Sequence, residues 1–210
     1  YENNYTSVAK YRNRMWYGSI LIAILSILFV VFLSFQGLPD FKQLENPDFE
    51  LATQVYDVKS REFGRDYTQN RLPVTYNELN PFLIDALVAT EDVRYFSHSG
   101  VDVEALSRVV MGVITFNTHK GGGSTITQQL AKLLFERPDF EGMSKMKKAL
   151  TLGLTKFKEW ITAVKLERQY TKQEILAMYL NKFNFIYGAY GISAASEIYF
   201  GKNQRDLKIE

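Results

Sequence analysis

A run of twenty residues without a charged side chain, WYGSILIAILSILFVVFLSF at 16–35, constrains this chain more than any other feature. At 1.5 Å per residue, a helix of that length spans roughly 30 Å, the thickness of the hydrocarbon core of a bilayer. Basic residues precede the run and acidic residues dominate the segment after it. Because basic residues favour the cytoplasmic side, the sequence predicts a cytoplasmic tail at 1–15, a transmembrane helix at 16–36 and the bulk of the chain outside. The basic residues are Lys10, Arg12 and Arg14.

A cleaved signal peptide is the alternative interpretation of this segment. The apolar run is long for a signal peptide, and no small-x-small cleavage motif follows it. We therefore favour an uncleaved membrane anchor. The chain starts without Met, so we expect it to begin inside a longer gene product.

The whole chain offers room for one sizeable domain besides this segment. It has 210 residues, of which 46% are hydrophobic and 14% aromatic. A net charge of +2 gives no indication of nucleic-acid binding, because nucleic-acid interfaces are usually strongly basic. Without cysteine, the chain has no disulfide and no thiol chemistry.

Beyond the apolar run, the pattern indicates a mainly α-helical domain with a small β element. The prolines and mixed charges of 37–51 are typical of a linker, and the domain is expected at 52–210. Short alternating patches at 52–74 predict a hairpin. Asn80 and Pro81 suit the N-cap and the first turn of a helix. Further helices are predicted at 103–114, 125–135, 144–170, 172–181 and 191–199.

The segment GGGSTITQQLAK at 121–132 places many hydrogen-bonding groups and little charge at a predicted helix start. Thr125 and Gln128 have the spacing of a capping box. A glycine-rich entry into a helix N-terminus is also a ready anion site, because free N–H groups and the helix dipole point the same way. The residue order is not that of a nucleotide-binding P-loop. A flexible loop followed by a well-capped helix is the alternative.

Two acidic residues fall near the end of the helix that starts after Asn80. The apolar stripe of this helix continues onto Glu91, and Asp92 follows directly. Burial and a neighbouring like charge both raise a carboxyl pKa, which is how a general base or acid near neutral pH arises. The alternative is a helix-end carboxylate that reaches solvent. His98 follows, and a lone histidine is more often structural than catalytic. The stripe consists of Ile84, Leu87 and Val88.

A second acidic candidate, Glu159, lies in the long helix predicted at 144–170. It falls outside the apolar stripe of that helix, and Lys156 precedes it by one turn. The plain interpretation is an exposed i,i+3 ion pair. Lys132 is, in the same way, a candidate for a solvated surface lysine. The stripe consists of Leu150, Leu154, Phe157, Ile161 and Val164.

Five motifs in a fixed order then point to one family. EDVRYFSHSG, GGSTITQQLAK, KFKE, EILAMYLN and GISAASEIYFGK follow the apolar segment. Together they resemble the motifs of the peptidoglycan glycosyltransferases, glycosyltransferase family 51. These enzymes occur alone or as the N-terminal half of bifunctional penicillin-binding proteins. The resemblance covers roughly residues 50 to 202.

The resemblance implies a mainly α-helical, lysozyme-like fold with a head lobe and a smaller, membrane-associated jaw lobe. It implies that lipid II is polymerised into β-1,4 glycan strands with release of undecaprenyl pyrophosphate. The expected partners are lipid II, the growing lipid-linked strand, the membrane and other cell-wall synthesis proteins, without nucleic acid. The expected location is the bacterial cytoplasmic membrane, with the catalytic domain on the periplasmic or extracellular side. No obligate cofactor is evident, although a divalent cation, Mg²⁺ or Mn²⁺, at the pyrophosphate is chemically reasonable; its ligands are unknown.

The resemblance also implies roles for individual residues. Glu91 corresponds to the base that activates the sugar 4-hydroxyl of the acceptor, and Glu159 to the second important carboxylate. The other positions are implied to bind substrate: Asp92, His98, Ser124, Thr125, Gln128, Gln129, Lys132 and Lys156.

The chain departs from the family pattern at three places. Tyr95 stands where phenylalanine is usual, and Thr155 stands where the third motif usually has arginine. The usual Tyr-Phe-Gly pattern is replaced by Asn-Phe-Ile-Tyr at 184–187. A lysine at 145, 147 or 148 is a candidate to replace the missing arginine charge. Two alternatives stay open: a lysozyme-like glycan-cleaving enzyme and a non-catalytic membrane scaffold of the same fold. The chain also ends at Glu210, short of the usual end of the domain, so we expect a fragment.

Overall fold

The computed structural model describes residues 2–35, 53–60, 62–66, 72–115, 122–134 and 138–208. The chain divides into two compact units, Tyr1–Leu38 and Pro39–Glu210. Gln36 and the predicted linker at 37–51 lie outside the described residues. The domain boundaries expected from the sequence therefore stay predictions.

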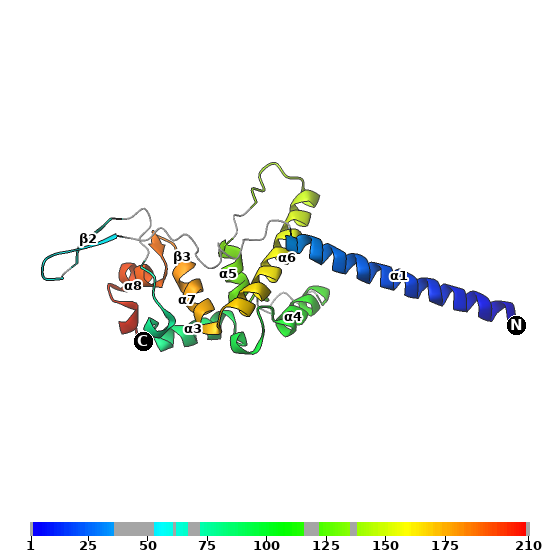
Figure 1. Cartoon of the computed structure of the whole chain (residues 1–210), viewed down its shortest axis with the longest axis horizontal. Helices are drawn as coiled ribbons and strands as arrows, with labels where there is room; N and C mark the ends of the chain where they lie inside the picture. The colour runs from blue at the N-terminus through cyan, green and yellow to red at the C-terminus, as the bar shows by residue number, and fades with distance from the viewer. Residues whose placement is uncertain are drawn as a thin grey trace. The chain divides into compact units, whose positions relative to one another are not determined.

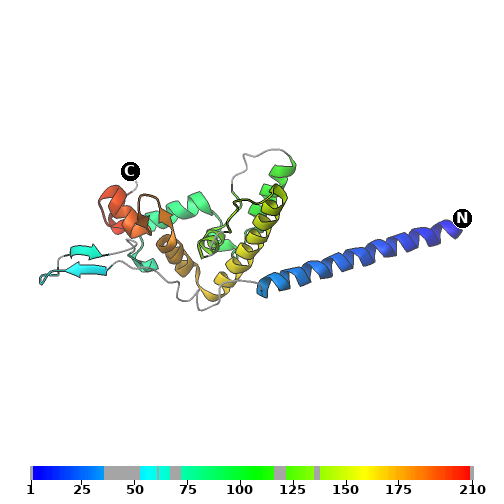
Figure 2. The ribbon, with the colours of Figure 1, turned by 90° about the horizontal axis from the view of Figure 1, so that it is seen from above.

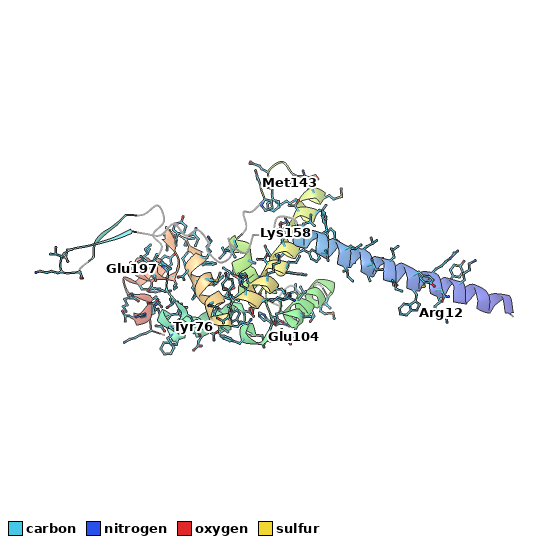
Figure 3. All side chains as sticks on the ribbon, viewed as in Figure 1. Arg12, Tyr76, Glu104, Met143, Lys158 and Glu197 are labelled. Atoms are coloured by element: carbon cyan, nitrogen blue, oxygen red, sulfur yellow. The ribbon has the colours of Figure 1, made fainter. Side chains whose placement is uncertain are left out.

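The described residues of the first unit form one continuous helix, α1 (Glu2–Phe35), along which side chains project on all sides (Figure 3). Large apolar side chains are exposed along it from Tyr11 to Phe32. Ser19 and Ser26 donate hydrogen bonds to carbonyl oxygens four residues back, which satisfies their hydroxyls within the helix. The predicted helix is thus confirmed, but its predicted transmembrane character over 16–36 is not. Among the described residues, no helix combines the length and the apolar character needed to cross a membrane.

The second unit is mainly α-helical, as predicted (Figure 1). Its α-helices are α3 (Pro81–Glu91), α4 (Val103–Ile114), α5 (Ile126–Leu134), α6 (Lys145–Gln169), α7 (Lys172–Lys182) and α8 (Ile192–Phe200). Short 3-10 turns are η1 (Tyr76–Glu78), η2 (Tyr95–Ser97) and η3 (Gln204–Asp206).

Among the described residues, the β structure of this unit consists of two antiparallel pairs. The predicted hairpin is confirmed as β1 (Thr53–Tyr56) with β2 (Glu62–Asp66), drawn as two cyan arrows in Figure 2, and its register shifts at Tyr56. The second pair, β3 (Asn184–Phe185) with β4 (Ala189–Tyr190), precedes α8.

The helix α3 starts at the residues from which its start was predicted, Asn80 and Pro81. Asn80 is the N-cap, and its side-chain oxygen accepts a hydrogen bond from the Phe82 backbone N–H at 2.9 Å, while Pro81 takes the first helical position. The Asn80 amide nitrogen donates to the carbonyl oxygens of Arg205 and Leu207. The cap therefore ties α3 to the segment around η3, 125 and 127 residues further along the chain.

The core of this unit surrounds α5, which packs against both α6 and α7. Burial of the apolar side chains between these helices supplies the main driving force for folding, at roughly 25 cal/mol for each Å² of apolar surface removed from water. The central buried side chains are Ile126 and Leu130 of α5, Leu166 of α6, and Ile175, Leu176 and Leu180 of α7.

The apolar stripe predicted for α6 is only partly buried. Leu150 and Phe157 are exposed, 65% and 40% respectively, whereas Leu154, Ile161 and Val164 are half-buried. The fully buried face is mostly small or polar, and neighbouring backbone approaches α6 closely there. Gly100 shows this: a Cβ at that residue would lie 2.8 Å from the Ala163 backbone, and its φ of +90° also favours glycine. The buried residues of α6 are Glu159, Thr162, Ala163 and Leu166.

Candidate active site

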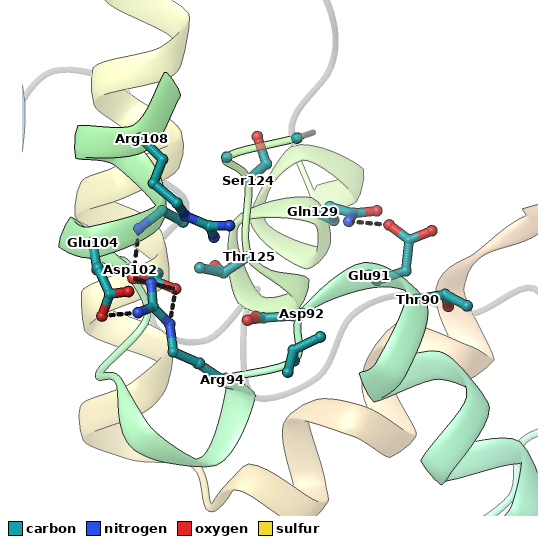
Figure 4. A pocket seen from close by; sticks show the side chains of 14 residues that line it. Thr90, Glu91, Asp92, Arg94, Asp102, Glu104, Arg108, Ser124, Thr125 and Gln129 are labelled. Carbon is teal, nitrogen blue, oxygen red and sulfur yellow. Dashed lines mark hydrogen bonds and ion pairs between the residues drawn. The ribbon is translucent and has the colours of Figure 1, made fainter. Parts of the chain in front are cut away.

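An open cleft of about 560 Å³ lies where the end of α3, the start of α4 and the glycine-rich entry to α5 meet (Figure 4). Carboxylate, guanidinium, hydroxyl and amide groups all reach it. It therefore suits a polar substrate. The lining residues are Thr90, Glu91, Asp92, Val93, Arg94, Asp102, Glu104, Ala105, Arg108, Gly122, Gly123, Ser124, Thr125 and Gln129.

Glu91 is the last residue of α3, and its side chain is exposed in this cleft. Its Oε2 accepts a hydrogen bond from Nε2 of Gln129 at 2.7 Å (Figure 4). The predicted burial of Glu91 is wrong, and the buried carboxylate is that of Asp92, at 7% exposure. Glu91 is still helical and continues the stripe, but α3 ends at this residue and its side chain lies in the open cleft.

Asp92 and His98 form a buried pair beneath the cleft. Nε2 of His98 lies 3.0 and 3.1 Å from the two carboxylate oxygens of Asp92. The Gly100 N–H donates to Nδ1 of His98, so the proton on Nε2 faces Asp92. Asp92 also accepts a hydrogen bond from the Ile126 N–H, at the positive end of α5. The pair thus joins α3 to α5, and its implied contact with substrate stays a prediction.

The capping box at the entry to α5 is confirmed. Thr125 Oγ1 accepts from the Gln128 N–H at 3.1 Å, and Gln128 Oε1 accepts from the Thr125 N–H at 3.3 Å. The Thr125 hydroxyl also donates to the Gly100 carbonyl at 2.6 Å. Gln128 is 2% exposed and does not line the cleft, whereas Ser124 and Thr125 do. Gln128 therefore holds the turn that presents its neighbours.

Lys156 and Glu159 form the predicted i,i+3 ion pair, with Nζ and Oε2 at 2.5 Å. The predicted exposure of the pair is wrong for Glu159, which is 4% exposed and needs a partner at that depth. Lys156 is exposed, and its Nζ lies 3.5 Å from Oγ of Ser124, at the edge of the cleft. Lys132 lies in the last turn of α5, exposed, one turn after Gln129.

Four charged residues on one side of the cleft were not found from the sequence. Arg94 donates three hydrogen bonds to the carboxylate of Asp102, at 2.6, 2.7 and 3.0 Å, and also pairs with Glu104. Burial pushes the pKa of Asp102 upward, but the Ala105 N–H bond and the bonds and charge of Arg94 hold that pKa below its usual value. Arg108 extends from α4 toward Ser124 (Figure 4), and forms no ion pair within the described segments. The only sequence signal for Arg108 was its position four residues after Glu104, which places both side chains on the same side of α4.

Tyr179 of α7 was also missed. Its hydroxyl donates to Oε1 of Gln129 at 3.0 Å, so Tyr179, Gln129 and Glu91 are hydrogen-bonded in series. Burial, and then the charge of Glu91, raise the pKa of Tyr179 to about 12. The described residues contain no group of three or more His, Cys, Asp or Glu side chains able to hold a metal ion. The divalent cation stays a prediction.

The cleft contains a carboxylate at a helix end, an amide that holds it, and nearby hydroxyl and cationic groups. This set of groups is typical of an enzyme that activates a hydroxyl by general-base catalysis. Residues 58–210 match the family model described as transglycosylase. This match covers more than half of the chain, so the chain belongs to the transglycosylase family. The expected membership in the peptidoglycan glycosyltransferases is confirmed.

Three relatives show how far the similarity extends. Penicillin-binding protein 1F of Bacillus subtilis is 36% identical over 188 residues, which is 90% of this chain and 24% of that protein. Penicillin-binding protein 1A of Aquifex aeolicus is 36% identical over 199 residues, 91% of this chain and 26% of that protein. Penicillin-binding protein 1A of Escherichia coli is 36% identical over 173 residues, which is 82% of this chain and 19% of that protein. The chain thus spans about a quarter or less of the length of these relatives.

Proposed function

We propose that this chain polymerises lipid II into β-1,4 glycan strands and releases undecaprenyl pyrophosphate, with Glu91 as the general base. The observation that carries the proposal is the geometry of Glu91. Gln129 occupies its Oε2 at 2.7 Å, while Oε1 accepts no hydrogen bond from any described residue. One carboxylate oxygen is therefore held, and the other is left for substrate in an open polar cleft.

The proposed step is a displacement at the anomeric carbon of the donor. The sugar 4-hydroxyl of the acceptor is a poor nucleophile at neutral pH, so its proton passes to Glu91 as its oxygen attacks. A bond forms between that oxygen and the anomeric carbon, and the bond from the same carbon to the phosphate oxygen breaks. Undecaprenyl pyrophosphate leaves with the electron pair of the broken bond.

Departure of pyrophosphate develops negative charge, which fixed cations stabilise. Lys156, at the edge of the cleft beside Ser124, and Arg108, which lines the cleft, are suited to this task. Lys132 has the third suitable charge, one turn along α5 from Gln129. We assign Glu159 the role of holding Lys156 in place, because its carboxylate is buried and paired with that ammonium. These cations support binding of a pyrophosphate even though Thr155 replaces the usual arginine.

A lipid-linked substrate requires action at a membrane surface, and the first half of α6 supports this. Met146, Leu150 and Leu152 are exposed there among several lysines. Exposed apolar side chains with interspersed lysines are typical of a surface that lies on a bilayer. The membrane-associated jaw lobe of a lysozyme-like fold is the proposed identity of this region. The lysines are Lys145, Lys147 and Lys148.

The function is tested by incubating the full chain with fluorescent lipid II and, separately, with finished cell wall. The proposal predicts a ladder of growing glycan from lipid II and no soluble fragments from the wall. Fragments from the wall without polymer would identify a lysozyme-like hydrolase instead. An absence of both reactions would leave a non-catalytic scaffold.

Lys156→Ala should lower the rate of polymerisation about 10-fold, less than the ~10² typical of a fully dedicated donor. The smaller effect is expected because Glu159 already neutralises part of the Lys156 charge. The double variant Lys156→Ala/Glu159→Gln removes the unpaired buried carboxylate and should recover thermal stability without recovering rate. Rates and melting temperatures are measured together. Recovery of rate along with stability would show that Lys156 only supports the fold.

The location of the chain is proposed from its charge pattern and its lipid-linked substrate. We place the N-terminus, with its three basic residues, in the cytoplasm and residues from Leu38 onward outside the bacterial cytoplasmic membrane. Protease added to spheroplasts should then digest the second unit without prior lysis. Digestion only after the membrane is opened would contradict this orientation.

A further inference from the structure

Tyr179 contacts the proposed catalytic carboxylate through one intermediate side chain. It is 4% exposed and does not line the cleft. Its ring packs against Phe183, with ring centroids 5.4 Å apart, and its hydroxyl donates to Oε1 of Gln129 at 3.0 Å. Nε2 of the same amide donates to Oε2 of Glu91 at 2.7 Å. The Gln129 amide thus connects a buried phenol on α7 to the carboxylate at the end of α3.

The two ends of this amide are not interchangeable. An ionised carboxylate only accepts hydrogen bonds, so Glu91 needs the NH₂ end of Gln129. A reversed amide would set Oε1 against the carboxylate with no proton between the two oxygens. In that orientation the Tyr179 hydroxyl donates to Oε1, which gives the amide a second fixed contact at its other end. The Tyr179 hydroxyl is protonated at neutral pH and is therefore able to donate this bond.

We propose that Tyr179 is a positioning residue for Glu91 and acts through Gln129. The inference rests on the proposed function, in which Glu91 is the base. Tyr179 orients the amide, the amide holds Oε2 of Glu91, and Oε1 is left facing the hydroxyl of the acceptor. The rate of proton transfer depends on this geometry, because a base must lie within hydrogen-bond reach of its proton.

Tyr179→Phe keeps the ring and its packing but removes the hydroxyl. The turnover number for lipid II should fall about 3- to 10-fold, the range expected for loss of one neutral hydrogen bond. The KM should stay within about 2-fold of wild type, because Tyr179 does not line the cleft. Tyr95→Phe is the matched control. Tyr95 is also fully buried, and its hydroxyl bonds the Lys172 carbonyl at the start of the same helix, so its turnover should be unchanged.

A double-mutant cycle separates positioning from a purely structural role. In a Gln129→Ala background the connection to Glu91 is already cut, so Tyr179→Phe should cause no further loss in single-turnover rate. A structural role would produce the same loss in both backgrounds, and that result would overturn the proposal. Wild-type turnover in Tyr179→Phe would overturn it as well.

The same assay distinguishes failure of this inference from failure of the proposed function. Glu91→Gln is measured beside the other variants. If Glu91→Gln is inactive and Tyr179→Phe behaves as wild type, only the positioning role is lost. If Glu91→Gln retains its rate, Glu91 is not the base, and the positioning role fails with it.

Discussion

Glu91→Gln should bind a lipid II analogue nearly as well as wild type but polymerise at least ~10²-fold more slowly, the loss typical of a missing general base. Glutamine keeps the shape of the side chain and can still contact Gln129, but it cannot take a proton from the acceptor. Glu91 lies in the open cleft rather than on a buried face; Gln129 holds one of its carboxylate oxygens, and the other accepts no hydrogen bond from the described residues. Binding and polymerisation are measured on the same sample.

Asp85→Asn is the matched control for this variant. Asp85 is an exposed acid on the same helix and does not line the cleft, so its neutralisation should leave the rate unchanged. If Glu91→Gln polymerises within a few-fold of wild type, another group takes the proton and the proposed mechanism is wrong.

Lys132→Ala should lower turnover by a factor on the order of 10² to 10³, by analogy with loss of one preorganised donor at a developing charge. Lys132 is exposed on α5, one turn after Gln129, so helical spacing directs it to the same side as the residue that contacts Glu91. Unlike Lys156, it forms no ion pair within the described segments, so its whole charge is available to a pyrophosphate. Turnover at saturating lipid II is the measurement.

Lys158→Ala provides the comparison for Lys132→Ala. Lys158 is a lysine of α6 that does not line the cleft, so its loss should change the rate little. Lys132→Arg keeps the charge and should retain more of the rate than Lys132→Ala. Near-wild-type turnover in Lys132→Ala would show that other groups stabilise the leaving pyrophosphate.

Structural features that depend only on residues within one or two helical turns could be predicted from the sequence. Asn80 and Pro81 begin α3 as expected, and the helix predicted at 103–114 agrees with α4 at both ends. The Thr125 to Gln128 spacing forms the capping box that it predicts. Each of these features is decided by neighbouring backbone groups, so the local sequence contains the information needed.

Features that depend on other helices could not be predicted in this way. Glu91 was expected on a buried face, but α3 ends there, and the side chain lies in the cleft. Glu159 was expected to be exposed, but it lies on the face of α6 that is buried together with Thr162, Ala163 and Leu166. Tyr179 reaches Gln129 across 50 residues of sequence, and no local pattern contains that contact. Helical periodicity gives the relative directions of side chains but does not say which direction another element will cover.

The most direct test of the central claim compares two products of one reaction. The full chain is incubated with lipid II, and new glycosidic bonds and released undecaprenyl pyrophosphate are counted in the same samples, for wild type and for Glu91→Gln. With Glu91 as the base, wild type should release one pyrophosphate for each bond formed, and Glu91→Gln should lose both products. Release of pyrophosphate without glycan, or glycan formation by Glu91→Gln at the wild-type rate, would contradict it.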